Sequence, residues 1–409
     1  KRKQKTLLAR KPKIHRKSKT NNRREAWVYR CLTFNGGEMG KVLQMTTNKA
    51  GKINLDEMRK LINKKSGMNV AHNLTKDNPT AVRQWIPTGS RWLDSIISRG
   101  KMAGVPVGKI TEIAGLPSSG KSFMAAQIAA NANKMGMVVV YFDAESSIDP
   151  EFLKRAGCNL EKLLYVQAVS VEKVLGHIEL LMSHDPDTQF VFIWDSVAAT
   201  ASEKDIEGDF NPQSSMAVKP RIFAKAFPKL TIPLADQQST LILINQLKTN
   251  ITMNIAEAMT TPYIAPGGKA IEYFSSLRIW LTKRKAKASY VQDDAGFRVG
   301  SEVKVKLEKS RFGSEGRTCT FKILWGSDVG IQDEESWLTA IKLSGTSRYS
   351  QSGAWCKLIT KKGKELKFQS SKWKEMLQDK EFRQTVYDIM DEEIIHRFDK
   401  KCEEIKIED

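Results

Sequence analysis

The chain is poor in the residues that build disulfide frameworks and structural metal centres. Its five cysteines are odd in number, lie far apart and include no C-x-x-C pair, and its five histidines are equally scattered. Disulfide scaffolds and zinc sites need such residues in close, paired spacing. The sequence therefore argues against both kinds of site and predicts a reducing compartment, the cytoplasm.

A long apolar run is also missing. A membrane-spanning helix needs about 18 or more consecutive apolar residues, whereas the densest runs here, residues 137–142 and 190–194, have only the length of a strand. We therefore expect a soluble protein with no membrane partner.

Acidic residues are scarce in the N-terminal segment. The formal net charge is +20, and residues 1–44 contribute fourteen Lys and Arg against Glu25 and Glu38, a net +12. Such a surplus favours a polyanion as partner, and the composition of this segment predicts a disordered arm. Two interpretations stay open: the arm binds DNA, or it lies upstream of a native start at Met45.

One phosphate-binding motif is complete. The pattern G-x-x-x-x-G-K-[ST] is filled by Gly115, Leu116, Pro117, Ser118, Ser119, Gly120, Lys121 and Ser122, between a strand-like run at 109–114 and a helical run at 123–134. Glycines let backbone N–H groups surround a phosphate, the lysine neutralises its oxygens and the serine hydroxyl can bind Mg²⁺. The motif predicts a bound nucleoside triphosphate; the alternative is a glycine-rich turn before an ordinary helix.

Apolar strand-length runs alternate with amphipathic stretches through the middle of the chain. After the run at 109–114 they occupy residues 137–142, 163–166, 190–194, 240–244, 277–281, 303–307 and 319–324. Near-continuous apolar strands separated by helices are typical of a parallel sheet buried on both faces, so the predicted fold class is α/β.

The two ends of the chain are predicted to be separate units. Apolar residues recur at helical spacing within residues 54–65, with Asn54 as N-cap and Gly67 as stop, and this helix with its linker occupies 45–88. It packs either on its own domain or on a neighbouring subunit. Beyond residue 330 the segments become short and mixed and end in a charged helix, 381–400, so we assign 336–409 to a small C-terminal domain.

Polar side chains end three of the predicted strands. Asp195 follows the strand 190–194, where it would hold Mg²⁺ opposite Ser122, or would merely cap the next helix. Glu145 is placed to orient or deprotonate a water. Its spacing alone is equally consistent with an ordinary surface glutamate in a loop between a strand and a helix. Gln246 ends the strand 240–244 and can sense a γ-phosphate, ahead of a loop of about twenty residues, a length that is more often functional or disordered than structural.

The order of these motifs resembles that of RecA-type recombinases, from about residue 89 to 330. The matching segments are 115–122, 142–145 with 148–150, 195–199, 206–208, 245–246, 267–270 and 299–302. The basic, Trp-bearing C-terminal part, including 353–355 and 372–373, looks more like bacteriophage UvsX recombinases.

The resemblance implies a RecA-like P-loop ATPase core over residues 89–335, with a mostly parallel twisted sheet flanked by helices. It implies an ATP- and Mg²⁺-dependent filament on single-stranded DNA that pairs with homologous double-stranded DNA and exchanges strands in recombination, repair and recombination-dependent replication. Mediator or loader proteins and single-strand binding proteins would assist, in the cytoplasm of the host cell if the chain is phage-encoded. The helix at 54–65 matches the segment that docks on the adjacent protomer.

By motif position, the resemblance also assigns roles at the ATP site. Glu145 would activate water, Gln246 would sense the γ-phosphate, and Asp149 and Phe152 would contact the adenine.

Two further cations, Lys309 and Arg311, match those that family members extend to the neighbour's ATP. Such cations would stabilise developing phosphoryl charge, so hydrolysis should require assembly.

For DNA, the family's two loops fall on about residues 203–216 and 248–266. Cations in such loops contact phosphates, apolar side chains wedge between bases, and glycine amides bind the backbone. The candidate phosphate-contacting cations are Arg221 and Lys248. The candidate apolar wedges are Met216 and Ile251, and the candidate backbone-binding amides are those of Gly267 and Gly268. The second loop offers few cations and departs most from the family.

Two other functions are compatible with parts of this sequence. A ring helicase or translocase shares the same core, but segments 206–208 and 299–302 favour a recombinase. A non-hydrolysing DNA-binding accessory protein should lack catalytic groups, yet Lys121, Ser122, Glu145 and Asp195 are all present.

Overall fold

The computed structural model describes residues 54–67, 70–76, 78–97, 103–208, 217–252, 254–283, 289–325 and 329–395. The chain divides into two units, residues 1–79 and 80–409. The predicted arm, residues 1–44, lies outside the described residues. Among the described helices, none combines the length and the apolar composition needed to cross a bilayer.

The first unit contains helix α3 (Leu55–Ser66). The side chain of Asn54 accepts hydrogen bonds from the backbone N–H groups of Asp56 and Glu57 at 3.1 and 3.3 Å. Gly67 ends the helix with a left-handed φ of 68°. The helix, its N-cap and its stop are therefore confirmed as predicted. No residue of α3 is buried, and Leu55 is 73% exposed.

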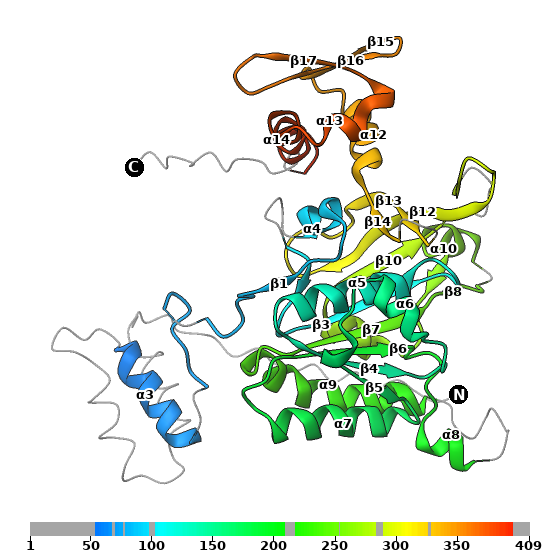
Figure 1. Cartoon of the computed structure of the whole chain (residues 1–409). Coiled ribbons are helices and arrows are strands. Elements are labelled where there is room, and N and C mark those ends of the chain that lie inside the picture. The colour runs from blue at the N-terminus through cyan, green and yellow to red at the C-terminus, as the bar shows by residue number, and fades with distance from the viewer. Residues whose placement is uncertain are drawn as a thin grey trace, which may run out of the picture. The chain divides into compact units, whose positions relative to one another are not determined.

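A ten-stranded sheet forms the centre of the second unit (Figure 1). Its strands are β3 (Ile110–Gly115), β4 (Val138–Asp143), β5 (Leu163–Gln167), β6 (Phe190–Asp195), β7 (Thr240–Gln246), β10 (Ser275–Thr282), β11 (Tyr290–Gln292), β12 (Arg298–Ser310), β13 (Thr318–Leu324) and β14 (Gly330–Gln332). Their order is β14-β13-β12-β10-β3-β7-β6-β4-β5, with β11 paired to β12. Pairings from β10 to β5 are parallel and the others antiparallel. The mostly parallel α/β sheet is confirmed, and every run predicted as a strand overlaps one of these strands.

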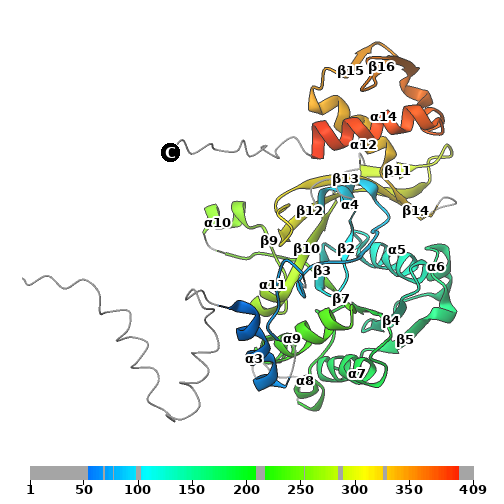
Figure 2. The ribbon, with the colours of Figure 1, turned by 90° about the vertical axis from the view of Figure 1, so that its left-hand side faces the viewer.

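Alternate residues of the central strands feed two separate cores. Val139 and Tyr141 of β4 pack with α4 (Arg91–Ile97), α5 (Lys121–Lys134) and α6 (Pro150–Arg155). Val140 and Phe142 pack instead with helices on the opposite face, which are α7 (Val171–His184), α9 (Val218–Asp236) and α11 (Lys269–Phe274). Figures 1 and 2 show α5 on one side of the sheet and α7 and α9 on the other. Burial on both faces explains why these strands read as continuous apolar runs.

The segment after β7 is more ordered than the sequence suggests. Instead of a long irregular loop, the structure has β8 (Lys248–Thr249) paired antiparallel with β9 (Tyr263–Ile264), with α10 (Ile255–Thr260) between them. Asn250 joins the two branches, since its backbone N–H donates to the Pro262 carbonyl at 2.9 Å and its side chain to the Thr261 carbonyl at 3.0 Å. We call residues 247–266 the β8–β9 arm, and from here on the word arm used alone means this segment, not residues 1–44.

The C-terminal residues have a core of their own. It is built by α12 (Glu334–Ser344), β15 (Tyr349–Ser352), β16 (Trp355–Ile359), β17 (Glu365–Gln369), α13 (Trp373–Met376) and α14 (Lys380–Ile389). Of the helix predicted over 381–400, α14 covers residues up to Ile389 and residues 390–395 form a π-helical segment, η4 (Met390–Ile395), while residues 396–400 lie outside the described residues. Ion pairs from Arg91 to Asp391 and from Arg348 to Glu392 accompany this change in winding.

Short elements complete the second unit. They are β1 (Trp85–Ile86), paired with β2 (Val105–Pro106); the 3₁₀ turns η1 (Leu160–Lys162) and η3 (Ser370–Lys372); and α8 (Glu203–Glu207).

Candidate nucleotide-binding site and DNA-facing loops

The P-loop connects β3 to α5, as its sequence predicts. A Cβ on Gly115 would overlap the Ser119 hydroxyl and would lie 2.7 Å from the Leu281 carbonyl oxygen. Gly120 has a left-handed φ of 90°, and a Cβ there would overlap Ile323. Both glycines are therefore needed for the close packing of the loop, and α5 begins directly after them with Lys121.

The polar groups of the loop are ready for an anion. Lys121 is buried, and its Nζ donates to the Leu116 carbonyl oxygen at 3.1 Å. Burial lowers the pKa of this ammonium, and the nearby carboxylates of Asp195 and Glu145 act against that shift. The buried hydroxyl of Ser119 has no hydrogen-bond partner within the described part of the chain. A phosphate at the N-terminus of α5 would satisfy these donors, so the residues present fit a nucleotide.

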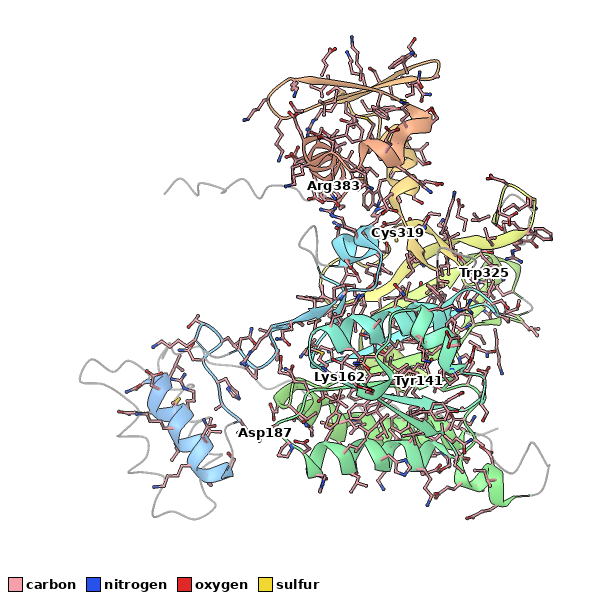
Figure 3. The ribbon with its side chains drawn as sticks, in the orientation of Figure 1. Tyr141, Lys162, Asp187, Cys319, Trp325 and Arg383 are labelled. Atoms are coloured by element: carbon pink, nitrogen blue, oxygen red, sulfur yellow. The ribbon has the colours of Figure 1, made fainter. Side chains whose placement is uncertain are left out.

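Asp195 and Ser122 lie together, as predicted. Asp195 ends β6, and its Oδ2 accepts a hydrogen bond from the Tyr141 hydroxyl at 2.9 Å. Burial raises the pKa of the Asp195 carboxyl, while hydrogen bonds from Ser122 and Tyr141 oppose that shift. One hydroxyl and one carboxylate beside a phosphate site are a fitting ligand set for Mg²⁺, which prefers oxygen ligands and binds together with substrate phosphates. Tyr141, labelled in Figure 3, was not anticipated from the sequence.

Glu145 and Gln246 are in direct contact. The Gln246 side-chain amide donates to Glu145 Oε1 at 2.8 Å, and the Ser196 hydroxyl donates to the same oxygen at 3.0 Å. The loop that carries Glu145 is fixed by Asp143, which accepts from the backbone N–H groups of Glu145 and Ser147, both at 2.9 Å. Asp143 and Ser196 were missed, although an Asp that ends a strand is a known signal for such a turn.

A pocket of about 480 Å³ opens beside the P-loop. Its lining comprises Ser118, Ser119, Gly120, Lys121, Ser122, Phe123, Phe152, Lys283, Arg298, Ser301, Val303, Ile323 and Trp325. Phe152 packs edge-on against Phe123, with ring centroids 5.9 Å apart. Asp149 is the N-cap of α6 and is not among these lining residues. The predicted Phe152 therefore lies in the wall of the pocket.

Three lining residues had no signal in the sequence. Lys283 donates to the Ser118 carbonyl oxygen at 2.7 Å. The Arg298 guanidinium lies 3.9 Å from the ring centre of Tyr290 and 5.1 Å from that of Trp325, which follows β13 and is labelled in Figure 3. Strand pairing brings these residues to the P-loop from more than 160 positions away in the sequence, which explains why no local pattern revealed them.

Lys309 and Arg311 do not lie in this pocket. In the sheet, Gly115 is opposite Leu281, and Leu281 is opposite Val305. Lys309 lies four residues further along β12, or about 13 Å at the usual rise per residue, away from the P-loop. Lys309 and Arg311 donate to the Tyr273 carbonyl oxygen at the end of α11, at 3.1 and 2.7 Å. Burial lowers the pKa of Lys309, and its neighbours Arg311 and Arg278 lower it further.

Several predicted DNA contacts gather where α9 begins. Arg221 and Lys248 are exposed, and Ile251 is 96% exposed. A Cβ on Gly268 would lie 2.9 Å from the Cβ of Pro220, so the two-glycine segment passes directly beside α9. Gly267 also needs its left-handed φ of 103°. Met216 lies outside the described residues.

Lys219 was missed as a candidate at this place. It lines a cavity of about 490 Å³ together with Asp205 and Gly267. Its Nζ donates to the Ala198 carbonyl oxygen at 3.3 Å. Burial lowers the pKa of Lys219, Asp205 opposes the shift and Lys248 adds to it. Asp205 of the first predicted loop and Lys248 of the second therefore both act on this ammonium, while residues 209–216 of the first loop lie outside the described residues.

Comparison with known proteins gives one consistent result. The family model described as the RecA N-terminal domain matches residues 53–331. Protein RecA of Chlamydia felis is 34% identical over 268 residues, which cover 66% of this chain and 73% of that protein. Protein RecA of Bifidobacterium breve is 32% identical over 303 residues, which cover 74% of this chain and 72% of that protein.

Proposed function

This chain belongs to the RecA family, and from that premise we propose how its own residues divide the work. It is an ATP-dependent recombinase and a DNA-dependent ATPase that uses ATP and Mg²⁺ and forms filaments on DNA. A ring helicase is not favoured. The observation that carries the residue assignment is the hydrogen bond between Gln246 and Glu145 beside the P-loop.

Within one subunit, the P-loop amides and Lys121 bind the phosphates. Ser122 and Asp195 would hold Mg²⁺, whose charge helps to neutralise the phosphate oxygens. Glu145 orients the attacking water and accepts its proton. Gln246 senses the γ-phosphate and can pass its presence to Glu145, because the Gln246 amide contacts that carboxylate. Phe152 and Asp149 serve the base.

The second half of the site comes from a neighbouring subunit. Lys309 and Arg311 lie too far from the P-loop of their own chain to reach its nucleotide, so they serve the ATP of the next protomer. Helix α3 is the docking element, because its apolar side chains Leu55, Leu61 and Ile62 are exposed to solvent and are not packed into a core of the described residues. Hydrolysis therefore depends on assembly.

DNA runs past Lys219, on which Asp205 and Lys248 act. Arg221, Lys248 and the amides of Gly267 and Gly268 bind phosphates, and Ile251, with Met216, wedges between bases. These contacts carry little base information, so we expect little sequence preference.

The remaining assignments rest on the sequence pattern. The chain is divided into a basic N-terminal segment at 1–44, a docking segment at 45–88, the ATPase core at 89–335 and a C-terminal domain at 336–409, which encloses a core of its own. We place the protein nearest to bacteriophage UvsX recombinases, in the host cytoplasm, assisted by mediator and single-strand binding proteins.

A strand-exchange assay tests the function directly. The protein, ATP, Mg²⁺ and a labelled single strand are mixed with a supercoiled duplex that contains the same sequence. We expect joint molecules that require ATP and homology. Unwinding of a forked duplex without joint molecules, with closed rings in negative-stain images, would support the helicase instead.

A further inference from the structure

A buried polar cluster lies against the sheet face that carries α11. At its centre, Glu112 is fully buried and uses both carboxylate oxygens. Oε1 accepts from the side-chain amide of Asn245 at 2.9 Å, and Oε2 accepts from Arg278 Nε at 2.5 Å. Asn245 is also fully buried, and Arg278 is 8% exposed. Because a buried ion pair gains little stability over apolar residues of the same size, the cluster is better explained by what it positions.

On one side, the cluster holds the end of the arm. The same Asn245 amide donates to the Pro266 carbonyl oxygen at 2.7 Å, directly before the glycines that lead into α11. Asn245 Oδ1 also accepts from the backbone N–H of Gln246 at 3.0 Å. The arm and the strand end that carries Gln246 are therefore tied to one side chain.

On the other side, the cluster reaches the interface cations. Glu112, Arg278 and Lys309 are opposite one another on three neighbouring strands. A β-bulge between Arg278 and Ile279 produces this alignment, since Ile279 is already opposite Leu307. If β12 were regular here, Lys309 would share the face of Leu307 and Val305, which point into the opposite core. The bulge turns Lys309 toward α11, where it donates to the carbonyls of Glu272 and Tyr273.

Helix α11 links these two sides. It is six residues long, begins at the glycines after Pro266 and ends at the carbonyl groups that hold Lys309 and Arg311. Next to it is a cavity of about 320 Å³, lined in part by Glu112, Pro266, Ile271, Glu272 and Arg278. The cavity gives α11 room to shift while the residues at its base stay connected.

We propose that Glu112 is a positioning residue that couples DNA bound at the arm to the cations Lys309 and Arg311, through Asn245, Arg278 and α11. Movement of Pro266 on DNA binding is passed by α11 to the carbonyls that hold the cations, and Glu112 keeps the sheet beneath it fixed. The inference rests on the proposed function. It assigns Glu112 no contact with ATP or DNA.

The test replaces the ion pair as a whole. The double variant Glu112→Met and Arg278→Met removes the two charges together and keeps the side-chain volume, which avoids an unpaired buried charge. The control, Glu179→Met with Lys229→Met, removes an exposed pair 2.9 Å apart that joins α7 to α9. ATPase kinetics with and without single-stranded DNA are measured on the full chain, together with DNA affinity with and without a non-hydrolysable ATP analogue.

We expect DNA to raise kcat much less in the double variant than in the wild type, with the KM for ATP in the absence of DNA unchanged. The factor by which the ATP analogue tightens DNA binding should fall by roughly 5- to 150-fold, the range of typical coupling energies, and the factor by which DNA tightens binding of the analogue should fall equally, because coupling of binding is reciprocal. The control pair and Arg278→Lys, which keeps the charge, should retain most of the coupling. A structural defect alone would lower the melting temperature without this selective loss.

Equal DNA stimulation in the double variant and the wild type would overturn the inference while leaving the recombinase function intact. A wild-type ATPase that ignores DNA would instead overturn the proposed function. If the double variant does not fold, Asn245→Ser, which releases Pro266 but leaves the ion pair, decides the question: undiminished coupling there also overturns the inference.

Discussion

Glu145 is fixed by three neighbours of different chemical character. Gln246 and Ser196 donate to its carboxylate, and Asp143 holds its backbone N–H. The carboxylate is therefore oriented by contacts within its own chain, and a change in the position of Gln246 reaches it directly. Preorganisation of this kind is what a group that orients water requires.

Replacing Glu145 with Gln should separate binding from hydrolysis. The amide keeps the size of the side chain but cannot accept a proton, so kcat with single-stranded DNA should fall by about 10²- to 10⁴-fold. Nucleotide affinity, measured with a fluorescent ATP analogue, should stay near the wild-type value because the P-loop is unchanged. Glu151→Gln, on the exposed face of α6, is the control. Hydrolysis at the wild-type rate in Glu145→Gln would remove its catalytic role.

A second carboxyl, Asp94, gives stability a defined pH dependence. Its Oδ1 accepts from the backbone N–H and the hydroxyl of Thr88 at 3.0 and 2.7 Å, yet burial raises the pKa of the carboxyl from 3.8 to about 7. The folded protein therefore keeps this proton at pH values where the unfolded chain has lost it. Stability contributed by Asp94 is present below pH 3.8 and is lost as the pH rises toward 7.

Asp94→Asn should remove this dependence, because the amide oxygen can accept the same two bonds without a charge. Relative to the wild type, the variant should gain about 1.4 kcal/mol for each pH unit crossed in that window. Urea unfolding at pH 5 and at pH 8 measures the gain. Parallel stability curves for the two proteins would show that Asp94 does not titrate in this range.

Among the elements, those set by local pattern were predictable. The strands of the parallel sheet, the P-loop and α3 with its Asn54 cap follow from runs of neighbouring residues. The arm was not predictable, because β8 and β9 are joined by Asn250 across eleven residues. Lys283, Arg298 and Trp325 reach the pocket only through strand pairing, and Lys309 faces α11 only because of a bulge.

The β8 strand contains a cation that should contact a DNA phosphate. Lys248 is exposed at the start of the arm, and as a phosphate contact it should release about one counterion on DNA binding. Lys248→Ala should weaken single-stranded DNA binding equally for all sequences and reduce the slope of log K against log salt by about 0.7. Fluorescence anisotropy at several salt concentrations measures the slope. Lys154→Ala, on α6, serves as the control, and an unchanged slope in Lys248→Ala would exclude a phosphate contact.

In the whole molecule, the proposed ATP site draws on residues from two ends of the same strand. Residues near the start of β12, Arg298 and Ser301, line the pocket of their own chain, whereas Lys309 near its end and Arg311 beyond it lie away from that pocket. Under the proposed assignment, a single chain holds two incomplete halves of different sites. Repetition of such a head-to-tail contact produces an open helical filament unless the rotation closes a ring.

Mixing two inactive variants tests this division most directly. Glu145→Gln has intact interface cations, and the double variant Lys309→Ala with Arg311→Ala has an intact P-loop and Glu145. Each alone should show almost no DNA-dependent ATPase. In an equal mixture about a quarter of the neighbouring pairs combine one intact half from each chain, so activity should reappear at about that fraction of the wild-type rate. If the mixture shows no more activity than the sum of the two variants, the ATP site is not completed by the neighbouring subunit.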